Sequence, residues 1–359
     1  MSETNINKEE KITKNCLRCG GNLEFSPKHQ AIFCCQCGTT YDIEKNKNIT
    51  KHNLQDVQDI KSEDKAFAEN NNVFNCPNCG SKLVLNKLEY TKKCPYCGSS
   101  QIKKTRINPG VSPDSIIPFK FDEEIAAEKF KQAMKKKVFA PNAFKKKPVT
   151  DNIYGIFIPT FAYDADTQTS YSGTERIEHT HTDSNHIRHV TYTYRNFSGN
   201  MAINHRNVLV EDSPSLNQLD LESIKPYNYN EMYKYNDDFI RGYTVEYHEH
   251  PIATCTDIAH TIMKNDINSS IRRKEGGDIV ALRTNTDFNC EKFAYYLLPA
   301  YKVEYKYKDI SYNSYVNGQT GKVGGNTPKS KVKVTFFTIF IVLLLGGLTA
   351  LFYYLFFML

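Results

Sequence analysis

The sequence lacks an apolar run near its N-terminus, where Met1 is followed by polar residues. This pattern predicts that no signal peptide is present and that residues 1–14 are disordered. The sequence also lacks a strong excess of either charge sign, because the formal net charge is only +6 over 359 residues. Such a small excess fits contact with anionic lipid or with nucleic acid but selects neither.

Recognisable catalytic motifs are missing as well. No set of Ser, His and Asp, and no set of Cys and His, indicates nucleophilic catalysis. We therefore predict no catalytic or cofactor-binding residues and expect that the protein is not an enzyme. Gly321-Lys322 is followed by Val323, whereas a phosphate-binding loop requires Ser or Thr at that position. Cys255 and Cys290 stand alone and are expected to be small buried residues.

A polar segment rich in histidine has two interpretations. Histidines two residues apart on a strand share a face, so the pattern admits a transition-metal site. The residues from Thr180 to Asn185 favour a turn, so a polar hairpin between two strands is the preferred interpretation. The four histidines are His179, His181, His186 and His189.

Eleven cysteines are present, and eight of them form four Cys-x-x-Cys pairs. In a chain that is not exported, such pairs hold metal rather than form disulfides, which places the soluble part in a reducing compartment. Four thiolates give zinc a closed structural site with no position for a reacting water. The predicted ligands are Cys16, Cys19, Cys34 and Cys37 for one Zn2+ ion, and Cys76, Cys79, Cys94 and Cys97 for a second.

The two cysteine segments are copies of one another. Fourteen residues separate the two pairs in each segment, and every predicted ligand recurs 60 positions later, as does the glycine after each pair. Fourteen residues suffice for a hairpin, so each segment is predicted to be a zinc ribbon that depends on metal to fold. Cys35 could replace Cys34, but only Cys34 keeps the two-residue spacing to Cys37. We therefore predict that Cys35 is not a ligand.

The ribbons admit two roles. Ribbons that contact nucleic acid carry basic and aromatic residues on the hairpin, and the second ribbon has more of these than the first. The same residues are ordinary in a basic chain, so docking of a protein partner is favoured and nucleic-acid binding is the alternative. The residues concerned are Lys82, Lys87, Tyr90, Lys92, Lys93 and Tyr96 in the second ribbon, and Arg18, Lys28 and His29 in the first.

The end of the sequence is a long run without charge, from Thr335 to Leu359. Its 25 residues would form a helix of about 37 Å, which is enough to cross a hydrocarbon core of about 30 Å. Lys329, Lys331 and Lys333 precede the run, and the positive-inside rule keeps that side in the cytoplasm. We predict a single-pass tail anchor in the cell membrane, with the bulk of the chain in the cytoplasm.

The region between the ribbons and this run shows mixed helical and strand patterns. Asp122 is a predicted N-cap for one helix, and a second helix is expected at about Thr256–Arg273, where Gly276 or Gly277 can stop it. Aromatic and charged residues alternate over Tyr301–Lys308, which indicates a half-buried antiparallel strand. Asn317-Gly318 then predicts a tight turn.

A faint internal repeat is also present. Ile158-Pro159-Thr160-Phe161 recurs 140 residues later as Leu298-Pro299-Ala300-Tyr301, each time after a predicted helix. The repeat suggests two related α+β halves. The lysine runs Lys135–Lys137 and Lys145–Lys147 flank the first predicted helix, where a solvated face is the default and attraction to anionic headgroups is the alternative.

The predicted fold class is α+β, with two small four-cysteine zinc ribbons, an antiparallel α+β domain and a C-terminal transmembrane helix. The linker between the ribbons carries one further expectation, a short polar helix at Leu54–Ala68. The predicted boundaries are 1–14 disordered, 15–43 first ribbon, 44–72 linker, 73–102 second ribbon, 116–325 α+β domain and 335–359 tail anchor.

The paired ribbons, together with three further stretches, resemble a bacterial family of membrane-associated double zinc-ribbon proteins. Members are often labelled TFIIB-type zinc-ribbon, primosomal-helicase-like or phage replisome organiser proteins. The three stretches are Gly155–Phe161, Pro299–Tyr307 and Val316–Gly325, and with the ribbons the resemblance covers most of the chain from Cys16 onward.

The resemblance implies a place in a membrane complex, with flotillin-like or phage-shock-type membrane-stress proteins as partners. The missing nucleotide-binding loop argues against a helicase engine. We therefore expect a non-enzymatic, membrane-tethered zinc-ribbon scaffold or adaptor, with a role in envelope stress or membrane-complex assembly. The alternative is a nucleic-acid-binding replication accessory protein held at the membrane.

Overall fold

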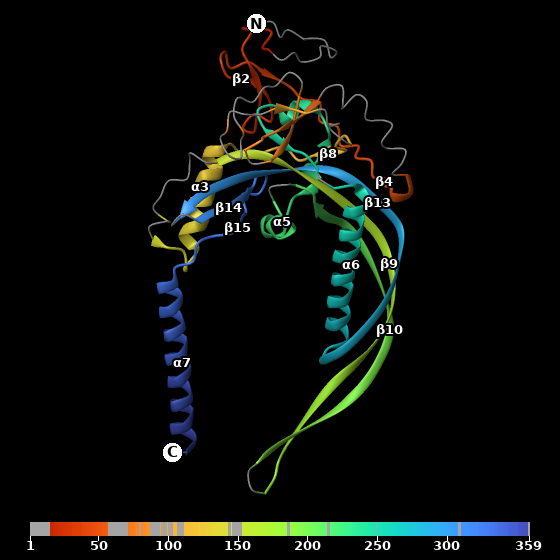
Figure 1. The fold of residues 1–359 in the computed structure, drawn as a ribbon, viewed down its shortest axis with the longest axis vertical. Coiled ribbons are helices and arrows are strands. Elements are labelled where there is room, and N and C mark those ends of the chain that lie inside the picture. Colours follow the sequence, from red (N-terminus) through yellow and green to blue (C-terminus); the bar gives the residue numbers. More distant parts are fainter. Residues whose placement is uncertain are drawn as a thin grey trace, which may run out of the picture.

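The computed structural model describes residues 15–56, 71–78, 80–86, 94, 99, 103–105, 111–142, 145, 153–184, 187–213, 216–248, 250–307 and 310–357. Within them the protein is a mixed α+β structure, with the first ribbon at one end and two long projections at the other (Figure 1). One projection is a curved arm of β-sheet, and the other is the C-terminal helix α7 (Lys331–Phe357). The predicted disordered segment 1–14 lies outside the described residues.

The first ribbon contains a small antiparallel sheet. Its strands are β1 (Leu23–Ser26), β2 (Ala31–Cys34) and β3 (Thr40–Tyr41), in the order β1-β2-β3. Leu23 and Phe25 on β1 are buried while Glu24 between them is exposed, as expected for a strand with one covered face. The hairpin expected between the two cysteine pairs is therefore present.

A second sheet of twelve strands forms the body. Its main path is β11-β8-β13-β9-β12-β6-β5-β7, and the remaining strands pair beside this path. Its members are β4 (His52–Asn53), β5 (Asn71–Asn75), β6 (Lys82–Asn86), β7 (Lys103–Lys104), β8 (Ser115–Ile116), β9 (Ile153–Thr182), β10 (Arg188–Glu211), β11 (Tyr233–Lys234), β12 (Thr244–Glu246), β13 (Asp278–Tyr307), β14 (Ile310–Asn317) and β15 (Val323–Gly325).

Both predicted helices of the body are present. Asp122 caps α3 (Glu123–Lys136), because its side chain accepts a hydrogen bond from the amide of Ile125 at 3.0 Å. The second predicted helix is α6 (Ile252–Glu275), which begins earlier than expected and ends at Gly276, whose φ is +70°. The remaining helical segments are η1 (Leu54–Asp56), α5 (Gln218–Ile224), η3 (Tyr229–Glu231) and η4 (Asp237–Ile240).

The repeat seen in the sequence corresponds to a local two-fold relation in the sheet. Ile158 on β9 pairs directly with Leu298 on β13, its counterpart 140 residues later. Short parallel strands flank this pair at matching positions, β12 beside Ile156 and β8 beside Tyr296. Each half therefore runs through a short strand, a helix, a long strand and a returning strand, as β8-α3-β9-β10 and β12-α6-β13-β14.

The curved arm is built by the distal halves of β9 and β10, the first half of β13, and α6. β10 pairs with β9 along the whole arm, and β13 joins them from Asp278 onward. Helix α6 lies along this sheet (Figure 1), and its buried apolar residues form one stripe. The buried residues of the stripe are Ile252, Cys255, Ala259, Met263, Ile267 and Ile271.

The predicted linker lies on the body where it is described. The Lys51 amine pairs with Asp164 at 2.7 Å, and the His52 ring contacts Asp114 at 2.6 Å. Strand β4 also pairs with β13. The polar composition conceals this contact, because Lys51 and His52 each have a carboxylate of the body as a partner. Of the helix expected at Leu54–Ala68, only η1 falls within the described residues.

Two strand predictions are confirmed with adjustments. The alternating segment at Tyr301 is the end of β13 and pairs with β14, but it is buried on both faces rather than half-buried, since Lys302 is only 4% exposed. The turn after Asn317 joins β14 to β15, but Gly321 rather than Gly318 takes the positive φ, at +79°. The histidine segment is a hairpin at the tip of the arm, where the rings of His181 and His189 stack 5.1 Å apart. His186 lies outside the described residues.

Candidate metal centre and membrane helix

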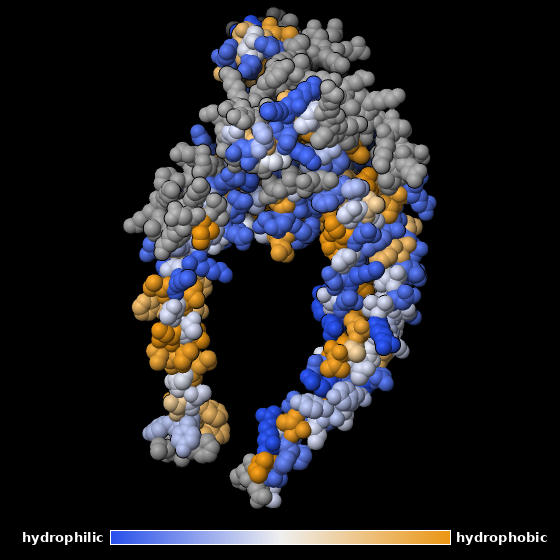
Figure 2. Space-filling model, in the orientation of Figure 1, coloured by the Kyte–Doolittle hydropathy of each residue, from blue (hydrophilic) through white to orange (hydrophobic). Residues whose placement is uncertain are grey.

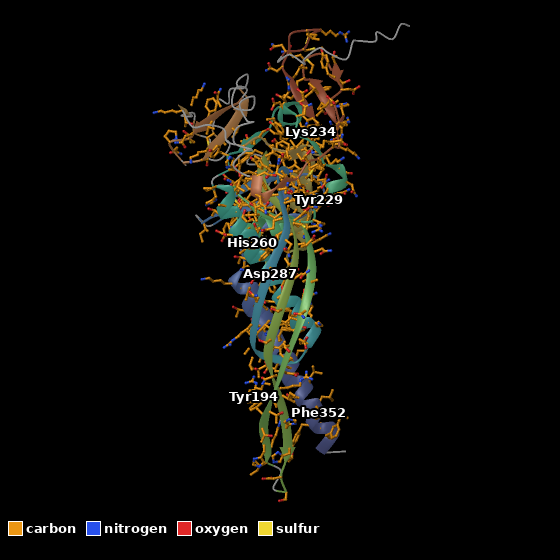
Figure 3. The ribbon with its side chains drawn as sticks, turned by 90° about the vertical axis from the view of Figure 1, so that its right-hand side faces the viewer. Tyr194, Tyr229, Lys234, His260, Asp287 and Phe352 are labelled. Atoms are coloured by element: carbon orange, nitrogen blue, oxygen red, sulfur yellow. The ribbon has the colours of Figure 1, made fainter. Side chains whose placement is uncertain are left out.

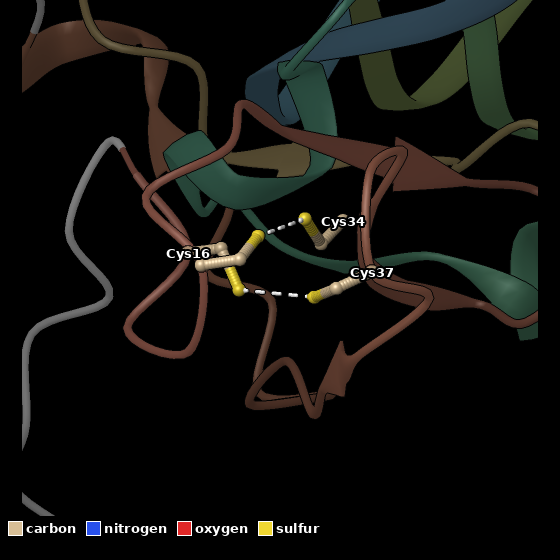
Figure 4. A group of neighbouring side chains, drawn as sticks. Cys16, Cys34 and Cys37 are labelled. Atoms are coloured by element: carbon tan, nitrogen blue, oxygen red, sulfur yellow. Dashed lines mark hydrogen bonds between the residues drawn. The ribbon is translucent and has the colours of Figure 1, made fainter.

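Four thiols converge at the end of the first ribbon. The sulfur atoms of Cys16, Cys19, Cys34 and Cys37 all lie within 4.8 Å of one another. The Cys16 and Cys37 sulfurs are 3.5 Å apart, and so are those of Cys19 and Cys34 (Figure 4). Four sulfurs bound tetrahedrally to one zinc ion at about 2.3 Å would be about 3.8 Å apart. The arrangement is compatible with one metal site formed by the four predicted ligands.

Tight backbone turns hold the two cysteine pairs in place. In the first turn the Gly20 amide donates to the Cys16 carbonyl at 2.7 Å, and in the second the Gly38 amide donates to the Cys34 carbonyl at 2.9 Å. Gly20 and Gly38 have φ values of +72° and +75°, which other residues adopt only with strain. The glycine after each pair is therefore explained by the turn that brings two sulfurs to one point.

Hydroxyl groups next to the thiols favour their ionised form. The Tyr41 hydroxyl accepts a hydrogen bond from the Leu17 amide at 3.1 Å, so it can donate to the Cys16 sulfur, 3.3 Å away. This donor lowers the pKa of Cys16 to about 6. The Thr39 hydroxyl similarly lowers the pKa of Cys37. A metal ligand must be a thiolate, so both contacts favour binding of a cation.

Cys19 behaves differently from these two thiols. The Gly21 amide lowers its pKa, but the neighbouring thiols of Cys37 and Cys34 outweigh that effect and raise it to about 12. Four thiols so close together cannot all ionise without a cation between them. Cys35 stands apart from the group, because it is exposed and its sulfur points to the Glu24 carboxylate at 3.8 Å. Its position agrees with the prediction that it is not a ligand.

The second ribbon repeats the backbone of the first where it is described. The Gly80 amide donates to the Cys76 carbonyl at 2.8 Å, and the φ of Gly80 is +76°. The Cys94 amide donates to the Ser99 carbonyl at 2.7 Å, as the Cys34 amide does to Thr39. Cys76 and Cys94 are both buried. The other two predicted ligands, Cys79 and Cys97, lie outside the described residues.

Both predicted ribbon segments contact the body where they are described. In the first, the Phe25 amide donates to the Arg241 carbonyl at 3.1 Å, and the Phe25 ring meets Phe239 edge to face at 5.7 Å. In the second, β6 pairs with β12 and so extends the large sheet. The ribbons are therefore held in fixed positions by the α+β domain, which the spacing of the cysteines alone did not indicate.

In the second ribbon, one of the basic and aromatic residues that suggested nucleic-acid binding lies within the described residues. Lys82 is described, and its amine lies 5.7 Å from the ring centre of Tyr247 on the body. The Lys82 side chain is therefore engaged in a contact within the protein. Five further residues of that set lie outside the described residues: Lys87, Tyr90, Lys92, Lys93 and Tyr96.

Helix α7 is long and apolar enough to cross a membrane. It runs from Lys331 to Phe357, so its first turn includes Lys331 and Lys333, while Lys329 lies just before it. The candidate span, Lys331–Phe356, has no buried residue. Figure 2 shows it as a mostly orange column that begins below blue residues. An apolar helix that the described residues leave exposed over this span fits a lipid environment.

A buried polar cluster that the sequence did not predict lies where β10 ends and α6 begins. The Asp212 side chain accepts from the amide of His250 at 3.1 Å and from its ring at 2.6 Å, and the His248 ring lies 3.9 Å away. Cys255 is buried beside it, and burial raises the pKa of its thiol to about 12, so it is not a reactive nucleophile. The two histidines, spaced two residues apart, are the signal that could have revealed this cluster.

Cys290 does not have the predicted burial. It is exposed and has a φ of +51° within the irregularity of β13 between Asn289 and Lys292, where the strand loses register with β9. A bulge of this kind turns a side chain away from the covered face. The sequence around Cys290 gives no sign of the bulge.

Comparison with known proteins yields one informative similarity. The chain is 24% identical over 327 residues to a Bacillus subtilis (strain 168) protein named "Uncharacterized protein YdjG", covering 90% of this chain and 92% of that protein. The similarity therefore extends far beyond the cysteine segments. No protein-family model matches the chain, and no solved structure matches it.

Proposed function

We propose that this protein is a membrane-anchored, non-enzymatic scaffold that presents two zinc ribbons on a rigid α+β body. The convergence of four thiols in the first ribbon carries the metal part of the proposal. Zinc is the proposed ion because four cysteine sulfurs make a closed tetrahedral site, which is typical of structural zinc. A second Zn2+ ion is proposed for Cys76, Cys79, Cys94 and Cys97, supported by the repeated turns around Cys76 and Cys94.

The membrane part of the proposal rests on α7. A helix of this length without charge in its centre, and with lysines at its start, is the expected form of a single-pass anchor. The lysines support a cytoplasmic position for the ribbons and the body, where thiolates stay reduced. By resemblance, the partners are flotillin-like or phage-shock-type membrane-stress proteins. These partners would dock on surfaces of the ribbons, which the body holds in fixed positions.

Metal content tests the first part of the proposal. We expect the full-length chain, purified in detergent, to hold two zinc ions per molecule by elemental analysis. Cys16→Ser and Cys76→Ser should each remove one ion, because three sulfurs bind zinc far more weakly than four. Cys35→Ser is the matched control and should leave the zinc content at two. A content of one, or iron instead of zinc, would contradict the assignment.

Salt dependence separates a scaffold from a replication accessory protein. Contacts to phosphates release counterions, so affinity for DNA or RNA falls steeply as salt rises. We expect nucleic-acid binding no tighter than about 10 µM at physiological salt, which is the nonspecific range. Protein partners captured from solubilised membranes should remain bound in high salt. A submicromolar complex with DNA or RNA that Lys92→Glu and Lys93→Glu abolish would favour the replication role.

A further inference from the structure

Two lysine clusters that are far apart in the sequence meet where α7 begins. One lies on the last turn of α3 and the segment after it, and the other leads into α7. Lys137 and Lys329 are close enough that the charge of Lys329, after burial, helps to lower the pKa of Lys137. We call this group the basic collar, and its members are Lys135, Lys136, Lys137, Lys145, Lys329, Lys331 and Lys333.

Hydrogen bonds join the two clusters into one surface. The Lys333 amine donates to the carbonyl of Ala140 at 2.9 Å and to the side chain of Asn142 at 2.8 Å. The Ser330 amide donates to the Phe139 carbonyl at 2.8 Å. The segment after α3 is thus fixed against the first turn of α7. Among the described residues, no carboxylate pairs with a lysine of the collar.

Apolar side chains lie in the middle of the collar. Val138 is 68% exposed and directly follows three lysines. The neighbouring ring of Phe139 meets Phe337 of α7 edge to face at 5.2 Å. Exposed apolar residues surrounded by lysines form the kind of surface that settles at the boundary between headgroups and acyl chains.

We propose that the basic collar and Val138 form a second membrane contact, which binds the anionic headgroups of the bilayer that α7 crosses. This inference rests on the proposed anchor, because α7 brings the collar to the membrane surface. The lysines supply attraction to anionic lipid, and Val138 and Phe139 insert at the level of the first acyl carbons. The collar thereby fixes α3, and with it the body, at the membrane surface.

Single tryptophans test the contact directly, since the chain contains none of its own. Full-length Val138→Trp and Leu344→Trp would be reconstituted in vesicles of phosphatidylcholine, with or without phosphatidylglycerol. Some vesicles would carry lipids brominated either near the headgroup or deep in the acyl chain. We expect the emission of Val138→Trp to be quenched by the shallow bromines, and more strongly when phosphatidylglycerol is present. The emission of Leu344→Trp, in the centre of α7, should be quenched by the deep bromines in both lipids.

Charge reversal identifies the lysines as the cause. Adding Lys135→Glu and Lys136→Glu to Val138→Trp should remove most of the phosphatidylglycerol-dependent quenching. The matched control adds Lys103→Glu and Lys104→Glu on exposed β7, which changes the net charge equally and should leave the quenching unchanged.

Three outcomes would count against the proposal in different ways. No quenching of Val138→Trp, together with quenching of Leu344→Trp, would overturn the collar and leave the anchor standing. No quenching of Leu344→Trp would instead show that the anchor itself is wrong. Quenching of Val138→Trp that depends neither on lipid charge nor on the lysine substitutions would overturn the headgroup contact.

Discussion

Single hydroxyl groups lower the pKa of two thiols in the first cysteine group. Tyr41→Phe removes the hydroxyl that lowers the pKa of Cys16, so protons should compete better with the metal for that sulfur. Loss of such a supporting contact typically lowers metal affinity about 10- to 100-fold. We expect zinc to be released at higher pH than from the native protein, as followed with a zinc-sensitive dye. A release profile that matches the native protein would contradict the role of Tyr41.

A buried histidine should make the arm sensitive to acid. Burial lowers the pKa of His205, which lies on β10 with its ring 3.8 Å from Asp266 of α6. His205 takes up a proton at higher pH in the unfolded chain than in the folded protein. The contribution of neutral His205 to the free energy of unfolding is therefore fully present above about pH 6.5 and is lost as the pH falls below that value. Thermal unfolding across this range should therefore depend less on pH in His205→Gln than in the native protein. His181→Gln, on the exposed tip, is the control and should not alter the profile.

The four cysteines that converge in the first ribbon are the part that the sequence predicts best. A zinc site of four cysteines imposes fixed spacing, so the spacing alone selects Cys16, Cys19, Cys34 and Cys37 and sets Cys35 aside. Tyr41 could not be assigned in the same way. Its contact with Cys16 depends on β3 folding back beside the first turn, and no spacing rule expresses that.

At the scale of elements, one aromatic side chain is central to the attachment of the first ribbon, beside the hydrogen bond of Gln30 to the Phe119 carbonyl. Phe25 is buried between Phe239 and Tyr243 of the body. Phe25→Ala should weaken this contact by about 3–5 kcal/mol of stabilising free energy, because the substitution leaves a cavity that rigid neighbours cannot fill. We expect faster hydrogen exchange in β1 and η4, measured by mass spectrometry, with the zinc content unchanged. Leu17→Ala, at an exposed position of the same ribbon, should change stability by less than about 0.5 kcal/mol.

Helices were easier to predict than strands, for a physical reason. The apolar repeat and the cap at Asp122 define α3 locally, whereas the length of β9 and β10 depends on contacts across the hairpin. Gly173 and Gly199 would ordinarily suggest turns. Here each lies opposite an aromatic residue, Phe197 or Tyr171, whose ring covers the space above the glycine. An aromatic ring that packs over a glycine from the neighbouring strand lets the strand continue through that glycine.

At the scale of the whole molecule, the arm and α7 extend in the same direction. Figure 3 places Tyr194 of the arm and Phe352 of α7 at similar heights. A flat bilayer crossed by α7 in this arrangement would also contain much of the arm, including Arg176 and Arg195. Charged side chains of this kind are excluded from hydrocarbon. Insertion should therefore change the angle between α7 and the arm, with the contacts of Ser330 and Lys333 to the segment after α3 kept.

This change of direction can be measured in vesicles. Tyr194 is 65% exposed, so Tyr194→Trp places a reporter on the arm without disturbing the core. We expect its emission to be unaffected by brominated lipids at either depth, while that of Leu344→Trp in α7 is quenched. Deep quenching of Tyr194→Trp would mean that the arm enters the bilayer together with α7.

The two-fold pairing of β9 with β13 also governs how the protein must fold. Ile158 meets Leu298 only after 140 residues of intervening chain have been made, and β13 lies between β8 and β9 in the finished sheet. Pairings between such distant segments form slowly. The cysteine turns, by contrast, close within a few residues and can bind metal at once. Folding should therefore proceed in two stages, in which the cysteine turns close first, with uptake of the proposed zinc, and the arrival of β13 completes the body.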